Sequence, residues 1–589
     1  MPEGQVSGLR VGSRIVTAML LVVGSLLVLA APASAGKILT RATYPDMSTF
    51  SCRTNAIPIY PGQNLNDFDI TQTCPNAEKL SGPGSVADFT AGSKVEGYVT
   101  RFKPSMVEIK PSGKLVTPSV WDLHLHHVVW LAPNGGPTFA SGEEKTIPKM
   151  PQGYGFKVAG GANWGINQMI HNLTASDNRQ VYMTWEIDWV PEKTPARTDI
   201  EPIKIRWLDV AGAPHIYPVF DAERGFDTNG DGKYVFPDEV PTDPAARGYE
   251  ERENISNARQ WTVGPGGATL VFGSGHLHPG GLNVDLKVAR DGPDAGTVAG
   301  DDPSEVRQLF RSRAKYYEPA GAVSWDVSMK VTRPDWRIRL KAGDRVSINV
   351  TYDVRKASWY ESMGILPLAW TKKNDPAAKD PFDDQAAVKA MYDAGGILSH
   401  GRLPENIDYK ANKNLGLPNP KRLKSKGKKV PKRGIKISSF LYSKGGYSAT
   451  RGFPKRLMRP PVINPGGTVT FTNLDALLPD PQNEQAWHSI TSCKAPCNKG
   501  SGIGYPLASG PIKFDSGQLG FGTGTSTEVT TGSNVYTTPK LTKPGHTYNY
   551  FCRIHPFMRG SIRVKGKSGI KRSRAASSGA LAPSGALPG

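Results

Sequence analysis

One short stretch near the carboxyl end, YFCRIHPFMRG, places three metal-binding side chains close together. Cys552 is followed three residues later by His555, and after three more by Met558. A further histidine, His488, stands well upstream in AWHSITS. One thiolate, two imidazoles and a thioether are the donor set of a type-1 blue copper site, because thiolate stabilises Cu(I) while imidazole accepts Cu(II). The sequence therefore predicts type-1 copper at His488, Cys552, His555 and Met558.

Two alternatives stay open at these residues. Zinc binds histidine and cysteine readily, although a thioether is a poor ligand for it. In a purely structural interpretation, Cys552 is a small buried apolar residue. The cysteine count favours a metal: the chain has five, and pairing near neighbours as disulfides Cys52–Cys74 and Cys493–Cys497 leaves Cys552 over.

These motifs resemble the cupredoxins, and within them the plastocyanin and amicyanin branch. The resemblance rests on NLD, HSIT and YFC-x-x-HPFMRG-x-I-x-V and covers about residues 435–566. It implies a Greek-key β-sandwich, one copper ion and outer-sphere electron transfer, with the four residues above at the family's ligand positions. The chain departs from the family in an insert after His488 that contains CKAPC, which leaves the redox partner open.

A second group of histidines lies upstream, on segments whose alternating apolar residues predict strands. The segments are WDLHLHHVVWL, NQMIHNL and GHLHPGG, and they hold His124, His126, His127, His171, His276 and His278. Residues at i and i+2 of a strand share a face, so His276 and His278 can reach one ion. The tandem pair His126-His127 normally points to opposite faces, so joint binding requires a bulge. His215 and His400 have no supporting pattern and are assigned structural roles.

The order of these ligands, with Met363 in ASWYESMG, resembles the copper type II, ascorbate-dependent monooxygenases, the peptidylglycine hydroxylase and dopamine β-hydroxylase group. The resemblance implies two further copper ions. Their ligands would be His126, His127 and His171 for electron transfer, and His276, His278 and Met363 at the ion where dioxygen binds. The spacing from His171 to His276 is longer than in that family. The same region also resembles the plant stress-up-regulated nodulin proteins and their bacterial relatives.

FDTNGDGKYVFPDEV has the spacing of a calcium loop. Asp227, Asn229 and Asp231 supply oxygen atoms before a glycine turn, and Asp238 stands at the twelfth position, with Glu239 one place late. The alternative is an acidic glycine turn without an ion.

The fold class follows from the apolar pattern. QVYMTWEIDWV and RVSINVTYDV alternate apolar and polar residues, and no long helical pattern competes with them. We expect an all-β protein with two β-sandwich (jelly-roll-like) domains followed by a Greek-key cupredoxin β-sandwich. The expected parts are a signal peptide (1–35), a sandwich with HH and the lone His (36–197), a sandwich with the calcium-like loop, HxH and Met (198–404), a basic linker (405–434), the cupredoxin domain (435–566) and a disordered basic tail (567–589).

The amino terminus predicts export. Arg10 and Arg14 precede the apolar run IVTAMLLVVGSLLVLAA and the small residues Ala33-Ser34-Ala35, the order of a secretory signal peptide. The alternative is an uncleaved anchor. No later stretch is long enough to span a bilayer, so we expect a secreted, extracytoplasmic protein without a transmembrane helix after cleavage.

The net charge of +20 gathers in the linker and the tail. These segments are either simply solvated or attach the protein to an anionic cell surface. Nucleic acid is not expected as a partner, because the chain is predicted to be exported and its positive charge lies in linkers.

Together these features predict a secreted copper-binding redox protein, whose cupredoxin domain donates electrons to an upstream dicopper monooxygenase-like module. Tethering the donor raises its effective concentration. Two alternatives remain: a non-enzymatic electron carrier whose front sandwiches form a binding or attachment module, and a protein for copper storage or delivery. Whether the chain is an enzyme, and on which substrate, stays open at this stage.

Overall fold

The structure is a computed structural model. It describes residues 40–566 apart from 62, 121–122, 134–135, 173–177, 194–199, 211–218, 240–259, 291–305, 318–321, 323–324, 356, 404–426, 431–433, 439, 444–445, 448–458, 477–486, 496, 498–507, 509, 521–532 and 556–557. The predicted signal peptide, most of the basic linker, the tail and His215 lie outside the described residues. Within them, no helix has the length and apolar character needed to cross a membrane.

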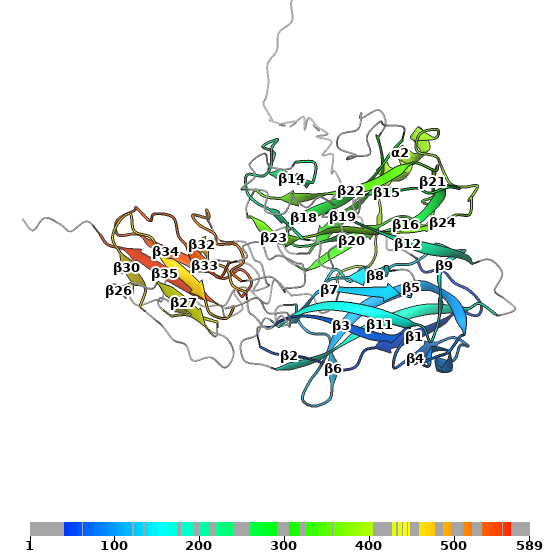
Figure 1. The fold of residues 1–589 in the computed structure, drawn as a ribbon, viewed down its shortest axis with the longest axis horizontal. Coiled ribbons are helices and arrows are strands. Elements are labelled where there is room, and N and C mark those ends of the chain that lie inside the picture. Colours follow the sequence, from blue (N-terminus) through cyan, green and yellow to red (C-terminus); the bar gives the residue numbers. More distant parts are fainter. Residues whose placement is uncertain are drawn as a thin grey trace, which may run out of the picture. The chain divides into compact units, whose positions relative to one another are not determined.

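The described chain is built almost entirely from strands, which confirms the all-β prediction (Figure 1). The one α-helix of the described residues is α2 (Gln385–Asp393), and a short 3-10 helix, η1, spans Val86–Phe89. The strands bury three main apolar cores. In the colours of Figure 1 their strands run from blue to cyan, through green, and from yellow to red.

The first sandwich packs two antiparallel layers against each other. One layer contains β1 (Ser48–Arg53), β2 (Ile57–Ile59), β4 (Glu78–Ser81), β5 (Glu96–Ile109), β6 (Leu115–Val116), β9 (Tyr154–Ala159) and β11 (Arg179–Pro191). The other has the order β3 (Asn64–Gln72), β10 (Asn163–Asn172), β7 (Leu123–Ala132) and β8 (Gly136–Ser141). Alternate residues of β11 face the core, where Trp185 lies 5.4 Å from Trp130 of β7, measured between ring centroids. Because side chains alternate between the two faces of a strand, β7 and β10, which carry the histidines, pack one face against this apolar layer.

The second sandwich shares a sheet with the first. The strand β12 (Glu201–Asp209) pairs in parallel with β9 and antiparallel with β24 (Gly364–Thr371), so one twelve-stranded sheet runs through both cores. It continues through β16 (Ala268–Gly273), β17 (His276–Leu277) and β21 (Ile338–Leu340). Backbone hydrogen bonds therefore continue from one core to the other, and the domain boundary near residue 197 stays a prediction.

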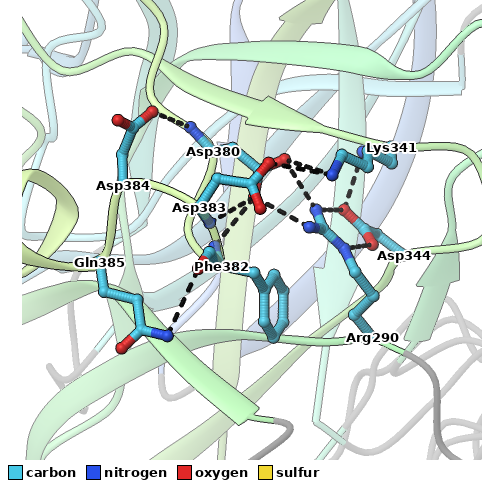
Figure 2. Close-up of polar contacts among 8 residues, drawn as sticks. All are labelled: Arg290, Lys341, Asp344, Asp380, Phe382, Asp383, Asp384 and Gln385. Atoms are coloured by element: carbon cyan, nitrogen blue, oxygen red, sulfur yellow. Dashed lines mark hydrogen bonds and ion pairs between the residues drawn. The ribbon is translucent and has the colours of Figure 1, made fainter.

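A seven-stranded sheet forms the other layer of the second sandwich. Its members are β14 (Lys233–Phe236), β15 (Gln260–Thr262), β18 (Gly281–Ala289), β19 (Val306–Tyr316), β20 (Val327–Val331), β22 (Arg345–Asp353) and β25 (Ile397–Leu398). A two-stranded ribbon pairs β13 (Phe220–Ala222) with β23 (Trp359–Ser362). At the end of β18, Arg290 donates to the carboxylates of Asp344 and Asp380 over 2.7–3.2 Å (Figure 2). This ion pair anchors the chain before α2 to the sheet.

The carboxy-terminal unit has two small mixed sheets. The first contains β26 (Lys428–Lys429), β29 (Gly446–Tyr447), β30 (Pro461–Ile463), β32 (Thr491–Cys493), β34 (Thr547–Phe551) and β35 (Arg559–Val564), and the second β27 (Ile435–Ser438), β28 (Leu441–Tyr442), β31 (Thr470–Asn473) and β33 (Val535–Thr537). The core includes the rings of Tyr442, Phe471 and Tyr550. Since β26 pairs with β30, the unit begins inside the segment predicted as linker.

Both predicted disulfides form. Cys52 of β1 is bonded to Cys74, and Cys493 at the end of β32 is bonded to Cys497. Cys552 is the free cysteine, and it is buried.

Candidate metal centre

Three parts of the carboxy-terminal unit supply the residues of this site. His488 forms an isolated bridge with Leu519, Cys552 directly follows β34, and His555 lies in the turn that leads to β35. All three side chains are completely buried. Their ligand atoms lie within 4.8 Å of one another, and no other set of three His, Cys, Asp or Glu side chains in the described part of the chain meets this condition.

The three ligand atoms face one small space. Cys552 Sγ lies 4.0 Å from His488 Nδ1 and 3.8 Å from His555 Nδ1, and the two Nδ1 atoms are 3.2 Å apart. The backbone amides of Ser489 and His555 point at the sulfur, at 3.3 and 3.2 Å. Both amides donate to the sulfur, and thiolate is the form in which cysteine binds metals.

A carboxylate orients His488 from behind. Asp475 Oδ2 lies 2.9 Å from His488 Nε2, which leaves Nδ1 to face Cys552. Burial lowers the pKa of His488, but hydrogen bonds with Asp475 and Cys552 outweigh it and raise the pKa to about 9. Carboxylates of this kind fix the ring orientation of metal-binding histidines. Asp475 is the last residue of the NLD motif, and we did not predict this role from the sequence.

Backbone hydrogen bonds close the loop that carries Cys552, His555 and Met558. Cys552 N donates to the carbonyl of Met558 at 3.0 Å, and Met558 N donates to that of His555 at 2.8 Å. Met558 is completely buried, and it belongs to the same apolar core as Cys552. The ring of Phe440 covers both imidazoles edge-on, with centroid distances of 5.3 Å to His488 and 4.8 Å to His555. The donor atoms of His488, Cys552 and His555 therefore lie together in a site closed to solvent, with Met558 buried in the same core.

Upstream, the structure brings all six histidines of the sequence pattern into the junction of the first two cores, where each is at most 7% exposed. β7 carries a bulge opposite Met169 and Ile170, and His126 is its extra residue. This is the irregularity that joint binding by the tandem pair requires. His126 Nδ1 lies 3.5 Å from His127 Nδ1, and His127 Nε2 lies 3.0 Å from Asn167 Oδ1.

The six rings form one connected set. Four of them contact the indole of Trp325 or one another at centroid distances of 4.4–5.8 Å: His124, His126, His171 and His278. The set continues to His127, whose ring centroid is 5.7 Å from that of His126, and to His276, whose centroid is 5.2 Å from that of His278. His124 was not among the predicted ligands. The sequence signal that identifies it is the H-x-H spacing of His124 and His126, the same spacing that identified His276 and His278.

Two of the six histidines line a cavity of about 240 Å³. His127, His276 and Met363 all contribute to its wall, together with mainly apolar neighbours. His276 Nδ1 lies 2.9 Å from Glu144 Oε1, a partner that the sequence reasoning missed. Met363 is held through its backbone, because its amide donates to the hydroxyl of Tyr352, at 3.1 Å, and its carbonyl accepts from it, at 2.6 Å.

The calcium-like loop is arranged differently from the prediction at its last position. Asp238 turns to Lys287, at 3.3 Å, and to the side-chain amide of Asn349. Glu239 instead accepts from Asn229 and from Thr228 of the loop. The Asp227 carboxylate accepts from Gly232 N at 2.9 Å, and Asp231 from Lys233 N at 2.8 Å. The longer glutamate side chain reaches back into the loop, so the structure puts Glu239 in the place predicted for Asp238.

His400 behaves as the structural histidine that the sequence suggested. It is buried, and both ring nitrogens have partners, the carbonyls of Gly401 at 2.6 Å and of Glu144.

Arg553, between two of the predicted copper ligands, contacts the second sandwich. Its guanidinium donates to the Ser358 carbonyl at 2.7 Å and lies 4.8 Å from the ring centroid of Trp359. Through this contact the loop of Cys552 and His555 touches β23, which immediately precedes Met363.

Comparisons with known proteins give likenesses of structure only. No family model and no curated protein matches the chain. Among solved structures, a mutant of amicyanin in its Cu(I) form is 19% identical, with 25% of this chain and 89% of that chain covered and a TM-score of 0.12. A Cu-containing nitrite reductase from Thermus scotoductus is 15% identical over 51% of this chain and 58% of that one, with a TM-score of 0.14. An infectious bursal disease virus structure is 10% identical over 57% and 77%, with a TM-score of 0.16.

Proposed function

We propose that the carboxy-terminal unit is a cupredoxin-type electron carrier that binds one copper ion at His488, Cys552, His555 and Met558. The observation that carries the proposal is the convergence of Cys552 Sγ and two imidazole Nδ1 atoms within 4.8 Å in a completely buried site. Copper bound there would supply a one-electron couple, since thiolate and thioether suit Cu(I) and imidazole suits both oxidation states. The chain's own contribution is a donor set held in place before the ion arrives.

The surrounding residues have separate tasks in this function. Asp475 holds His488 in the tautomer that presents Nδ1, and the amides of Ser489 and His555 donate to Cys552 Sγ and fix its position. Phe440 keeps water from the imidazoles. A site fixed in this way needs little rearrangement when its charge changes, which is the requirement for rapid outer-sphere electron transfer.

The test is copper content, visible absorption and electron paramagnetic resonance of the full chain and of Cys552→Ser. We expect one type-1 copper with a strong blue thiolate band, and loss of that band in Cys552→Ser. The matched control is the double variant Cys493→Ser/Cys497→Ser, which changes two other cysteines of the same unit and should keep the band. A colourless protein that takes up one zinc and no copper would overturn the proposal in favour of the zinc alternative.

A second function, oxidation of a substrate at the upstream histidines, is favoured by two observations. The cavity beside His127, His276 and Met363 gives a small molecule access to these predicted ligands, and the contact of Arg553 with Ser358 links the carrier to β23. We propose that electrons pass from the carboxy-terminal copper to this region, where His276, His278 and Met363 would hold the ion at which dioxygen reacts. Met363→Ala should then abolish hydroxylation while the blue band persists. Full hydroxylation in Met363→Ala would remove Met363 from the mechanism.

Three further proposals, on location, surface attachment and calcium binding, rest on the sequence. The two disulfides support an extracytoplasmic location for the mature protein. Attachment to an anionic surface through the basic linker and tail, and calcium binding by the loop of Asp227, Asn229 and Asp231 with Glu239, are proposals of the same kind. Sedimentation with anionic vesicles and calorimetric titration with Ca²⁺ test them, and no binding in either experiment would reject the corresponding proposal.

A further inference from the structure

A groove on the second sandwich combines two tryptophans with positive charge. It has a volume of about 560 Å³ and is open at the surface. Trp261 of β15 and Trp370 of β24 belong to its wall, and their ring centroids are 5.1 Å apart. Polar side chains complete the wall, among them those of Arg206, Gln260 and Lys372. The size is that of a small-molecule site, since such sites occupy about 300–1,000 Å³.

The arginine of this groove stands at a core-facing position of β12. Lys204, Arg206 and Leu208 share one face of the strand, because side chains alternate between its two faces. Leu208 is fully buried in the second core, whereas Arg206 is half-buried and Lys204 is exposed. The guanidinium carbon of Arg206 lies 5.9 Å from the ring centroid of Trp261. Lys204 Nζ lies 5.8 Å from that of Trp370, so each indole carries a cation over its ring.

Arg206 has no acidic partner among the described residues. Its guanidinium forms no ion pair with them, its Nε is buried without a hydrogen-bond partner, and burial lowers its pKa. Arg311 shows the usual arrangement for a half-buried arginine of this sandwich, because it donates to Asp285 at 2.6 Å. A partly desolvated cation without a counter-charge is destabilising. An anionic ligand would supply the counter-charge that the described residues do not.

A second donor of the groove is also unsatisfied. Gln260 is 8% exposed, and its Nε2 is buried without a hydrogen-bond partner in the described part of the chain. The acids of β12 do not compensate, because Glu201 and Asp209 lie on the opposite face of the strand. There Glu201 accepts from the Thr371 hydroxyl at 2.7 Å. None of the described residues that line the groove is acidic, so a ligand must bring the negative charge.

We propose that this groove binds an acidic sugar, a pyranose ring carrying a carboxylate, as one unit of an anionic polysaccharide. The apolar C–H face of a pyranose packs against an indole, and its hydroxyl groups suit polar edges such as Gln260 and Thr262. The planar guanidinium of Arg206 matches a carboxylate with two parallel hydrogen bonds. An open and largely polar groove suits a unit of a longer chain, whereas an aromatic anion would favour an enclosed apolar pocket.

The groove is separate from the candidate metal centres. Trp207, which follows Arg206, points to the other face of β12 and lines the cavity beside His127 and Met363. Sugar binding should therefore not depend on copper, and failure of this inference would leave the copper proposals standing. The groove also differs from the basic linker and tail as a means of attachment, because it depends on tryptophan as well as on charge.

The test is titration of the full chain with trigalacturonate, an oligomer of an acidic sugar, followed by tryptophan fluorescence and calorimetry. Maltotriose is the uncharged counterpart. We expect saturable binding of trigalacturonate and no binding of maltotriose. Arg206→Gln should weaken the affinity at least about tenfold, because a hydrogen bond between charged groups is lost. Arg333→Gln removes the same charge at an exposed arginine and should bind like the wild type.

A second variant separates the groove from general attraction of anions to a basic chain. Trp370→Leu keeps the net charge of +20 but removes one aromatic surface, so it should weaken binding about three- to tenfold. Melting temperatures and circular dichroism of the ligand-free variants establish that they fold. If Trp370→Leu does not fold, Lys372→Gln takes its place, since Lys372 is exposed, and it should bind more weakly than Arg333→Gln.

Four outcomes would overturn the proposal. The first is no binding of trigalacturonate, and the second is equal binding of maltotriose or of inorganic phosphate. The third is an equal loss of affinity in Arg206→Gln and Arg333→Gln, which would indicate general charge attraction. The fourth is unchanged binding in a folded Trp370→Leu variant.

Discussion

Nδ1 of His276 lies 2.9 Å from Oε1 of Glu144, across 132 residues of sequence. Glu144 follows β8 of the first sandwich and His276 begins β17 of the second, so this contact joins the two cores. Glu144 is 1% exposed and also accepts from Gly142 N at 2.8 Å. The carboxylate thereby places the proton of His276 on Nδ1 and turns Nε2 away from the contact, which is how carboxylates orient metal-binding histidines.

Replacing Glu144 by Ala should lower the free energy of unfolding by about 2 kcal/mol, because the buried Nδ1 of His276 and the amide of Gly142 both lose their acceptor. Urea titration of the metal-free protein, followed by tryptophan fluorescence, measures the change. Glu78→Ala is the matched control, since Glu78 is exposed on β4 and should cost less than about 0.5 kcal/mol. Equal stabilities of the two variants would contradict the structural role of Glu144.

Replacing Asp475 by Asn should weaken copper binding by the carboxy-terminal site about 10- to 100-fold, the usual effect of removing a carboxylate that orients a ligand. The expected cause is loss of the fixed orientation of His488, whose Nε2 lies 2.9 Å from Asp475. Competition with a copper chelator measures the affinity. Asp335→Asn, at a carboxylate that is 68% exposed, is the control. An unchanged affinity in Asp475→Asn would show that the buried loop alone orients the ring.

Replacing Met558 by Gln should lower the reduction potential of the bound copper. An amide oxygen favours Cu(II) relative to a thioether, and each tenfold change in the ratio of Cu(II) to Cu(I) affinity shifts a one-electron potential by about 59 mV. A redox titration of the blue band measures the shift. Met329→Leu, in the second core, is the control and should leave the potential unchanged. Met329→Gln would be unsuitable, because it would bury an amide there. A potential that is the same in Met558→Gln and wild type would exclude Met558 as a ligand.

Replacing Arg290 by Met should destabilise the second sandwich by about 3 kcal/mol near pH 7, because two largely buried carboxylates, Asp344 and Asp380, lose their cation (Figure 2). Burial tends to raise the pKa of Asp380, but the hydrogen bonds from Arg290 outweigh it and the pKa is lowered. A carboxylate with a lowered pKa stabilises the fold above the ordinary pKa of about 4. That contribution is lost as the pH falls through the ordinary value towards the lowered one.

The loss of wild-type stability on acidification should therefore be weaker in Arg290→Met. Urea titrations between pH 7 and pH 3 test both the size and the direction. Arg333→Met removes an exposed pair with Asp335 and should cost less than about 1 kcal/mol. A parallel pH dependence of Arg290→Met and wild type would show that Arg290 does not set the pKa of Asp380.

The sequence by itself determined the features that depend on neighbours in the chain. Alternating apolar residues specify which face of a strand is buried, so the all-β class and the core face of β11 were predictable. Cys552, His555 and Met558 lie in one short loop, and a loop of this length keeps its donors together whatever the rest of the fold does. The two disulfides also followed from pairing neighbouring cysteines.

Only the tertiary structure decided which distant residues meet. The register of β7 against β10 pairs His171 with His124, and the bulge at His126 shifts it so that Met169 pairs with His127. A shift of one residue would reverse the faces. Glu144, which follows β8, meets His276 of β17 across 132 residues of sequence. Side-chain length decided between Asp238 and Glu239 in the acidic loop. Local pattern encodes burial and periodicity, whereas partners far apart in sequence depend on how the sheets close, which no short motif contains.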